Sequence, residues 1–297
     1  MSGMLNALSE VAVSQPSSAF TLLRRPAKER RALACWLALP DRISAEAPPL
    51  IAVHGIRRCA KDQAALFAPR ATALGRPVIA PLFDADHWPR YQQVVRKGRA
   101  DLALLALLAE LRAAGIWGTP DVELAGFSGG AQFVHRFAML YPTMVTRLTV
   151  ASAGWYTFPD GATFPYGLAA RPGRADDWGP RLAAGLERFL RLPIQVCVGE
   201  RDNLPDPNTR SGPEIDRQQG RDRVARAIGW ADALRRAARE RGIAPRVAMT
   251  LLPRCGHDFR ACVRRGGLDR LVLPDQSASS SAQSDSLWDE APPRPVA

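Results

Sequence analysis

The sequence contains no uncharged apolar run of the roughly 18 residues that a helix needs to cross a bilayer. Residues 1–20 also lack a basic start followed by a continuous apolar core, which a secretory signal peptide requires. These absences argue against a protein that spans or is secreted across a membrane. They predict no membrane partner and a cytoplasmic location.

Cysteine is scarce as well. The chain has five cysteines, an odd number, and they show no paired spacing: Cys35, Cys59, Cys197, Cys255 and Cys262. A disulfide framework normally uses an even number of cysteines, and a zinc site needs closely spaced ligands. We therefore expect reduced, buried thiols, with neither a disulfide framework nor a bound metal.

Positive charge, in contrast, is abundant, because 40 Lys and Arg residues face 29 Asp and Glu residues and give a formal net charge of +11. A clustered basic surface would suggest nucleic-acid binding through neutralised phosphates. The basic residues are nearly all arginine, however, and are scattered among acidic ones. The longest cluster, Lys28, Arg30 and Arg31, lies in an expected turn. This distribution favours a basic protein surface and predicts no nucleic-acid partner.

Short apolar runs recur along the chain, separated by helical segments. Runs of this length are typical of strands buried on both faces of a sheet. They occupy residues 50–53, 78–80, 122–125, 148–151, 194–198 and 247–252. Two earlier segments, residues 20–23 and 33–39, flank a polar stretch and predict an opening hairpin.

Apolar residues at helical spacing predict the helices between these strands. One helix ends near Gly115 and another precedes the last strand; their apolar positions are Leu102, Leu105, Leu108 and Leu111, and Val224, Ala227, Ile228, Ala231 and Leu234. Strands that alternate with helices predict an α/β fold, with a mostly parallel central sheet flanked by helices.

We expect one domain over residues 20–273, after a flexible N-terminus at 1–19 and before a disordered, Ser-, Ala- and Pro-rich tail at 274–297. Two segments, at about 155–180 and 203–220, directly follow predicted strands. Ligands of open α/β sheets bind beyond the carboxyl ends of the strands, so these segments are expected to form a small cap or pocket walls. The sequence gives no indication of oligomeric state.

The strongest local motif is Gly126-Phe127-Ser128-Gly129-Gly130, which lies between a predicted strand and a helix at about residues 131–140. A nucleophile elbow has this arrangement: glycines let the strand and the helix approach closely, and a strained turn exposes the serine hydroxyl. Ser128 is therefore the candidate nucleophile.

A serine hydroxyl needs a base that removes its proton, and the chain has only four histidines. His54 ends an early strand, His87 lies in a loop, and His135 lies inside the helix after Ser128. His257 follows the last predicted strand, at the sheet edge where the elbow is expected. We therefore predict that His257 is the base.

The acid that orients the base should follow Ser128 and precede His257 in the chain. Asp202 lies in the turn after the strand at residues 194–198 and is the candidate. Glu200, two residues earlier, is the alternative acid.

Acyl transfer also needs donors for the oxyanion. The backbone N–H of Gly129 follows the nucleophile directly. The turn at His54-Gly55 leaves the N–H of Ile56 as the second expected donor. Arg57 and Arg58 follow at the expected pocket mouth, where they could attract an acidic substrate or face solvent.

In this arrangement the chain resembles the α/β-hydrolase superfamily over residues 20–273. Within it, GFSGGAQFVHRFAMLYP and ASAGWYTFPD resemble bacterial esterases of the polyhydroxybutyrate depolymerase and feruloyl esterase-like group. The resemblance implies hydrolysis of a carboxylic ester through an acyl-Ser128 intermediate, without a cofactor. Because no secretion signal is present, a small soluble ester or thioester is the expected substrate rather than an extracellular polymer.

Three aromatic residues after a strand, Trp155, Tyr156 and Phe158, are expected to line the acyl pocket or else to pack in the core. Two alternatives remain open: an amide or peptide hydrolase that uses the same triad, and a ligand-binding protein that kept the fold without turnover.

Overall fold

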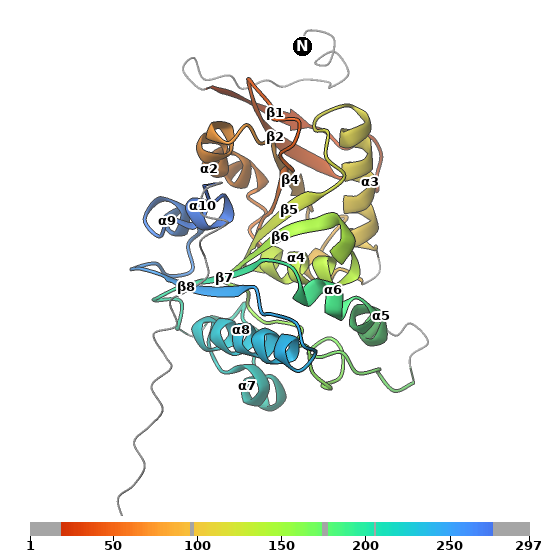
Figure 1. Ribbon diagram of the computed structural model, residues 1–297, viewed down its shortest axis with the longest axis vertical. Helices are drawn as coiled ribbons and strands as arrows, with labels where there is room; N and C mark the ends of the chain where they lie inside the picture. Colours follow the sequence, from red (N-terminus) through yellow and green to blue (C-terminus); the bar gives the residue numbers. More distant parts are fainter. Residues whose placement is uncertain (1–18, 96–97, 174–177, 205, 276–297) are drawn as a thin grey trace, which may run out of the picture.

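The short apolar runs of the sequence form a single sheet in the computed structural model, which describes residues 19–95, 98–173, 178–204 and 206–275 (Figure 1). Its eight strands lie in the order β1-β2-β4-β3-β5-β6-β7-β8. The strands are β1 (Phe20–Arg25), β2 (Ala34–Pro40), β3 (Leu50–Val53), β4 (Val78–Leu82), β5 (Val122–Phe127), β6 (Val145–Ala151), β7 (Ile194–Gly199) and β8 (Val247–Leu252). The expected hairpin is confirmed, since β1 and β2 are antiparallel. The strands β4, β3, β5, β6, β7 and β8, named in their order across the sheet, are parallel to one another.

Helices cover both faces of the sheet. On one face lie α3 (Ala100–Ala113), α4 (Gly129–Leu140) and α8 (Arg223–Arg239), which contribute Leu104, Phe137 and Trp230 to one hydrophobic cluster. On the other lie α2 (Ala60–Ala73), α9 (Phe259–Arg264) and α10 (Leu268–Val272), whose buried residues form a second cluster (Figure 1). The sheet is therefore buried between two apolar layers, as the continuous strand runs predict.

The remaining elements of the described residues are short: the single-turn helices η1 (Tyr91–Gln93) and η2 (Pro142–Met144), and the helices α5 (Trp178–Ala184), α6 (Leu186–Leu190) and α7 (Pro213–Gln219). Among the described residues, none of the helices combines the length and the apolar composition that crossing a membrane would demand.

The parallel strands bring four chain turns to one edge of the sheet. Val53 of β3 is in register with Gly126 of β5, and Phe127 of β5 with Ala151 of β6. On the far side, Gly199 of β7 is in register with Leu252 of β8. The residues that follow β3, β5, β7 and β8 therefore meet at the carboxyl edge.

The predicted helices exist, but the predicted apolar faces are partly wrong. In α3 the structure buries Leu104, Leu107, Leu108 and Leu111, whereas Leu102 is 47% exposed. The segment has leucine on almost every side, so spacing alone cannot select the buried face. In α8 the predicted Ile228 is 40% exposed, while Trp230 is fully buried.

The cysteines are free, as expected, and four of them are buried. Cys59 is exposed, contrary to the expectation, because it lies in the loop before α2. The predicted flexible N-terminus and disordered tail lie outside the described residues, apart from residue 19 and residues 274–275.

The first predicted insertion, residues 155–180, has no helix or strand before Trp178 in its described part, apart from a single bridge between Thr163 and Ala169. The second, residues 203–220, contains α7.

The contact between α4 and β3 gives a stability prediction. A Cβ atom at Gly130 would lie 2.0 Å from the carbonyl oxygen of Val53, and this backbone neighbour cannot rotate away. Gly130→Ala should therefore lower the free energy of unfolding by about 3 kcal/mol or more.

The matched control is Gly229→Ala in α8, where an added Cβ meets nothing within 4 Å. It should raise stability by up to about 1 kcal/mol, because alanine is the better helix former. Urea denaturation of both variants measures the difference; equal midpoints would show that the α4 contact is not tight.

Candidate active site

The elbow places Ser128 in a strained turn between β5 and α4. Its φ and ψ are 56° and −116°, a conformation that L-residues rarely adopt. The Ser128 N–H donates to the carbonyl oxygen of Ala151 on β6 at 2.9 Å, and the Ser128 carbonyl accepts the N–H of Gln132 at 3.2 Å. A Cβ at Gly126 would lie 2.4 Å from the backbone of Gly130, so the turn requires glycine there.

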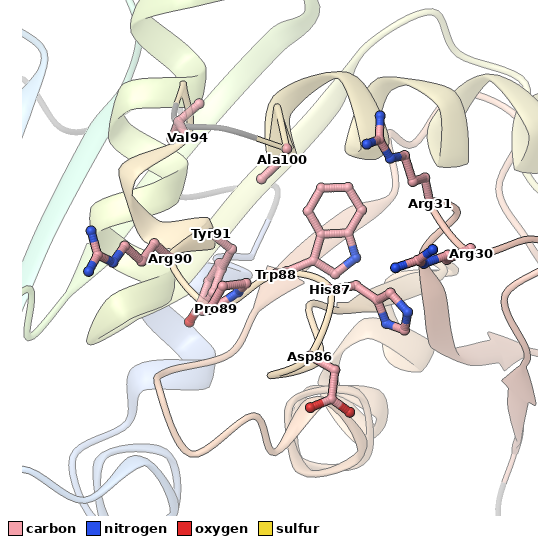
Figure 2. Close-up of a pocket in the computed structure, with 11 residues that line it drawn as sticks. Arg30, Arg31, Asp86, His87, Trp88, Pro89, Arg90, Tyr91, Val94 and Ala100 are labelled. Carbon is pink, nitrogen blue, oxygen red and sulfur yellow. The ribbon is translucent and has the colours of Figure 1, made fainter.

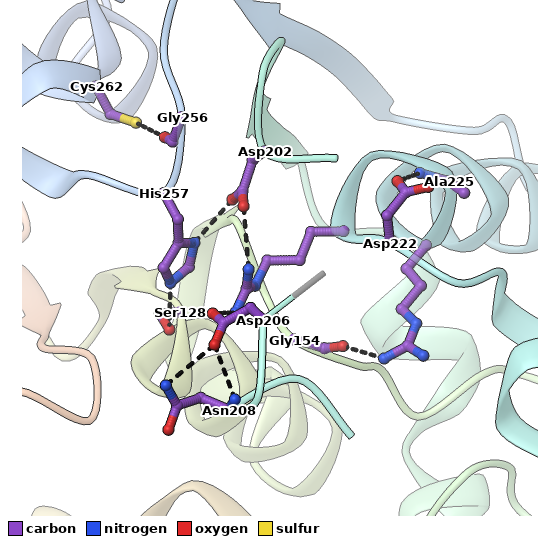
Figure 3. A network of polar contacts seen from close by, with 12 residues as sticks. Ser128, Gly154, Asp202, Asp206, Asn208, Asp222, Ala225, Gly256, His257 and Cys262 are labelled. Carbon is purple, nitrogen blue, oxygen red and sulfur yellow. Dashed lines mark hydrogen bonds and ion pairs between the residues drawn. The ribbon is translucent and has the colours of Figure 1, made fainter. Parts of the chain in front are cut away.

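His257 reaches Ser128 from the loop between β8 and α9. Its Nε2 lies 3.0 Å from Ser128 Oγ, and its Nδ1 lies 2.7 Å from Asp202 Oδ2 (Figure 3). With the Nδ1 proton donated to the carboxylate, Nε2 is free to accept the serine proton. The imidazole also packs on Phe127, with ring centroids 5.1 Å apart. The three residues predicted from the sequence thus form one hydrogen-bonded line.

The turns that carry Asp202 and His257 are joined by a backbone hydrogen bond. The Arg201 N–H donates to the Cys255 carbonyl at 2.8 Å, so the loop after β7 and the loop after β8 are joined directly. Asp258 then caps α9 by accepting the N–H of Ala261 at 2.7 Å. These bonds fix the backbone on both sides of His257.

Asp202 has a second partner that the sequence analysis did not predict. The buried guanidinium of Arg223, at the start of α8, donates to Asp202 Oδ1 at 3.1 Å and also pairs with Asp206. Burial alone would raise the pKa of Asp206, but hydrogen bonds from Arg223 and Asn208 lower it to about 2. The Asp222 cap of α8 signals the helix start, but no local signal shows that Arg223 reaches back to Asp202.

Glu200, the alternative acid, does not contact His257. Its Oε2 accepts the backbone N–H of Arg254 at 2.8 Å, and it therefore bridges the loops beside the site.

The other histidines are engaged elsewhere. His54 is buried and its Nε2 accepts the N–H of Phe83 at 3.1 Å, while burial lowers its pKa to about 4. His135 is buried and accepts the N–H of Thr157 at 3.1 Å; burial lowers its pKa as well. His87 is exposed and pairs with Asp84. Of the four histidines, His257 alone contacts Ser128.

The two expected oxyanion donors lie close to each other in the turns beside Ser128. A Cβ at Gly129 would lie 3.4 Å from the Ile56 nitrogen, and a Cβ at Gly55 would lie 3.6 Å from Ser128 Oγ. Gly129 is the first residue of α4, where a helix leaves its N–H groups without intrahelical partners. Among the described residues, no backbone acceptor binds the Ile56 N–H. Both N–H groups therefore remain available to a ligand.

The turn before Ile56 is held by residues that the sequence analysis missed or misjudged. The Tyr91 hydroxyl donates to the His54 carbonyl at 2.5 Å. Arg58, expected at the pocket mouth, donates instead to the carbonyl oxygens of Phe83, Asp84 and Trp88. Its guanidinium is thus occupied by the backbone, whereas Arg57 is exposed.

The three aromatic residues expected to line the acyl pocket are almost fully buried. Tyr156 stacks on Trp230 with ring centroids 4.6 Å apart, and Phe158 belongs to the hydrophobic core. Trp155 packs under the Arg136 guanidinium, 4.0 Å from its ring centroid. These contacts agree with the alternative expectation that the three aromatic residues pack in the core.

Metal ligation has no candidate in the described ranges, since no three His, Cys, Asp or Glu side chains gather there as a metal site would require.

The sheet order and the turns at its carboxyl edge define a member of the α/β-hydrolase superfamily, and comparison with known structures agrees. The poly(3-hydroxybutyrate) depolymerase from Bordetella parapertussis is 26% identical, with a TM-score of 0.69 over 88% of this chain and 93% of that one. The expected resemblance to polyhydroxybutyrate depolymerases is thereby confirmed.

Poly(aspartic acid) hydrolase-1 from Sphingomonas sp. KT-1 is equally similar, with 26% identity and a TM-score of 0.69 over 81% of this chain and 93% of that one. An S-formylglutathione hydrolase from Agrobacterium tumefaciens shares the fold at 12% identity, with a TM-score of 0.58 over 88% of this chain and 98% of that one. No family model and no curated relative matches the sequence.

The Arg223 contacts predict how stability depends on pH. Asp206 has its pKa lowered from 3.8 to about 2, so its contribution to stability is complete above pH 4 and is lost as the pH falls through 2. In Arg223→Gln this lowering should largely disappear. The stability difference between the two proteins should therefore be greatest above pH 4 and shrink toward pH 2, as measured by urea midpoints over that range.

The control is Arg260→Gln, which removes a guanidinium from the exposed pair with Asp62. Such a surface pair contributes about 0–1 kcal/mol, so the midpoint should change little at any pH. A loss in Arg223→Gln that is constant across pH would contradict the proposed role of Asp206.

Proposed function

We propose that the protein is a serine hydrolase that cleaves a carboxylic ester or thioester through an acyl-Ser128 intermediate. The observation that carries the proposal is the continuous hydrogen-bonded line from Asp202 through His257 to Ser128. A hydroxyl becomes a competent nucleophile when an oriented base lies within hydrogen-bonding distance, and this line meets that requirement.

In the proposed reaction, Ser128 Oγ attacks the carbonyl carbon of the substrate while its proton passes to His257 Nε2. Asp202 accepts the Nδ1 proton in a hydrogen bond and stabilises the imidazolium that forms. The backbone N–H groups of Ile56 and Gly129 bind the oxyanion of the tetrahedral intermediate, and each such donor is worth about 3 kcal/mol.

The intermediate collapses when the bond to the alcohol or thiol breaks and His257 Nε2 returns its proton to the leaving group. Water then attacks the acyl-Ser128 carbonyl and gives its proton to the same nitrogen. The bond between the acyl carbon and Ser128 Oγ then breaks, and His257 Nε2 returns the proton to Oγ, which releases the carboxylic acid and restores the serine hydroxyl. These steps use only groups of this chain and water.

A second candidate is amide hydrolysis by the same residues. The neighbour described as a poly(aspartic acid) hydrolase favours it, whereas the neighbour described as a poly(3-hydroxybutyrate) depolymerase favours ester cleavage. Turnover of p-nitrophenyl esters beside aminoacyl p-nitroanilides separates the two. Faster turnover of the anilides would replace the ester proposal.

The role of Ser128 is tested with a fluorophosphonate probe, which labels activated serines covalently. The wild type should be labelled and should hydrolyse p-nitrophenyl esters. Ser128→Ala should lose the label and about 10⁶-fold in kcat, because the nucleophile is removed.

The control for this loss is Ser152→Ala, which changes a buried serine that follows the neighbouring strand β6 and also has a positive φ. That variant should still be labelled. An unlabelled wild type would favour a ligand-binding protein without turnover.

The choice of acid is tested by a pair of isosteric variants. Asp202→Asn should lower kcat by about 10⁴-fold, since an amide favours the wrong imidazole tautomer. Glu200→Gln should keep most of the activity, because Glu200 contacts Arg254 rather than His257. The reverse order of the two effects would assign the role to Glu200.

A further inference from the structure

A cavity of about 510 Å³ lies beside the elbow, between the loop that ends in η1 and the turn that joins β1 to β2 (Figure 2). Its volume is that of a site for a small organic molecule. Its walls include the Trp88 and Tyr91 rings and the side chains of Arg30, Arg31, His87 and Arg90. Neither the oxyanion donors nor the Ser128 line belongs to this lining.

The lining carries unneutralised positive charge. Arg30, Arg31 and Arg90 contribute to it, and Asp86 is the one carboxylate among the described lining residues. In Figure 2 Arg30 and Arg31 lie on one side of Trp88, whereas the Arg90 guanidinium points away from them. All three arginines are exposed, and within the described ranges none of their guanidinium groups makes a hydrogen bond or ion pair with the protein. Guanidinium groups that the protein leaves unpaired are suited to an anion from outside.

Trp88 supplies an independent sign of a ligand. It is 5% exposed, yet its indole Nε1 is buried and has no hydrogen-bond partner among the described residues. In Figure 2 this nitrogen points toward Arg30 and His87. A buried N–H without a partner costs stability, so an acceptor that reached this nitrogen from the cavity would relieve that cost.

Two contacts join the cavity to the reactive serine. Tyr91 lines the cavity, and its hydroxyl lies 3.0 Å from the position of a Cβ on Gly129. Arg58, two residues after the oxyanion donor Ile56, binds the carbonyl of Trp88 in the cavity wall. Tyr91 therefore borders both the cavity and the elbow.

We propose that this cavity binds a carboxylate that the substrate carries at a distance from the bond to be cleaved. The proposal rests on the proposed function and narrows its substrates to acidic esters. A singly charged carboxylate matches the guanidinium fork and is repelled by Asp86 less than a doubly charged phosphate is. The Trp88 and Tyr91 rings suit the methylenes that would link this carboxylate to the reacting carbonyl.

The kinetic test compares p-nitrophenyl hemisuberate with p-nitrophenyl octanoate, which are charged and neutral esters of similar length with chains long enough to pass the Tyr91 side chain. The wild type should show the lower KM for the charged ester, and added salt should reduce the difference because the arginines are exposed. In the double variant Arg30→Gln and Arg31→Gln, the ratio of charged to neutral KM should rise about tenfold.

The matched control is the double variant Arg236→Gln and Arg239→Gln, which removes the same charge from exposed positions on α8. It should keep the wild-type ratio. If the KM ratio rose equally in both double variants, the effect would come from net charge, and the cavity assignment would be wrong. A wild type without preference for the charged ester would also overturn the assignment.

A binding test needs no turnover and so separates this proposal from the proposed function. Isothermal titration with glutarate should show binding to the wild type and to Ser128→Ala, and loss of binding in the Arg30 and Arg31 double variant. If phosphate binds and glutarate does not, the substrate class is wrong. If glutarate binds but no ester is hydrolysed, the cavity stands and the hydrolase proposal fails.

Discussion

The close approach of α4 to β3 is the constraint on which the candidate site depends. Gly130 lies against the Val53 carbonyl, and Gly126 lies against Gly130, so α4 begins directly after β5. The chain can turn this sharply only with Ser128 at a positive φ, at a cost of about 1–3 kcal/mol. Packing of α4 in the core and the Ser128 bond to β6 offset that cost. The same turn places the Gly129 N–H beside Ile56.

The second requirement is electrostatic. The Asp202 side chain is almost fully buried, and a buried carboxylate without partners is strongly unfavourable. Here it is bound by His257 on one oxygen and by Arg223 on the other. Arg223 belongs to α8 and also binds Asp206, so it joins the helix, the segment after β7 and the histidine in one network. The imidazole is held in place by this network and by its packing on Phe127.

Much of this arrangement follows from the sequence. Buried parallel strands are continuous apolar runs, so the strands were predicted to within a few residues. Because such strands end at one edge, Ser128, Asp202 and His257 could be placed together from their positions after β5, β7 and β8. The face of α3 could not be chosen, since its leucines surround the helix. The helix α2 was not predicted, and it contains Pro69 in its interior, which normally argues against a helix.

The contacts that sequence reasoning missed join residues far apart in the chain through loops. Arg223 to Asp202, Tyr91 to His54 and Arg58 to Trp88 span 21 to 37 positions, and their directions depend on loop packing. No local pattern encodes such directions. Trp155 and Tyr156 illustrate the same limit, because an aromatic residue after a strand can face a pocket or the core with equal ease.

The positions of the arginines show why the net charge of +11 does not by itself indicate a binding partner. Arg136, Arg223 and Arg226 are almost completely buried and bind carbonyl or carboxylate oxygens inside the protein. Such residues raise the formal charge without presenting a guanidinium to a partner. The arginines that matter for recognition are therefore those left unpaired at a concave surface. Arg30, Arg31 and Arg90 line one cavity that also includes Tyr91 beside the elbow, and their guanidinium groups are exposed to an incoming anion.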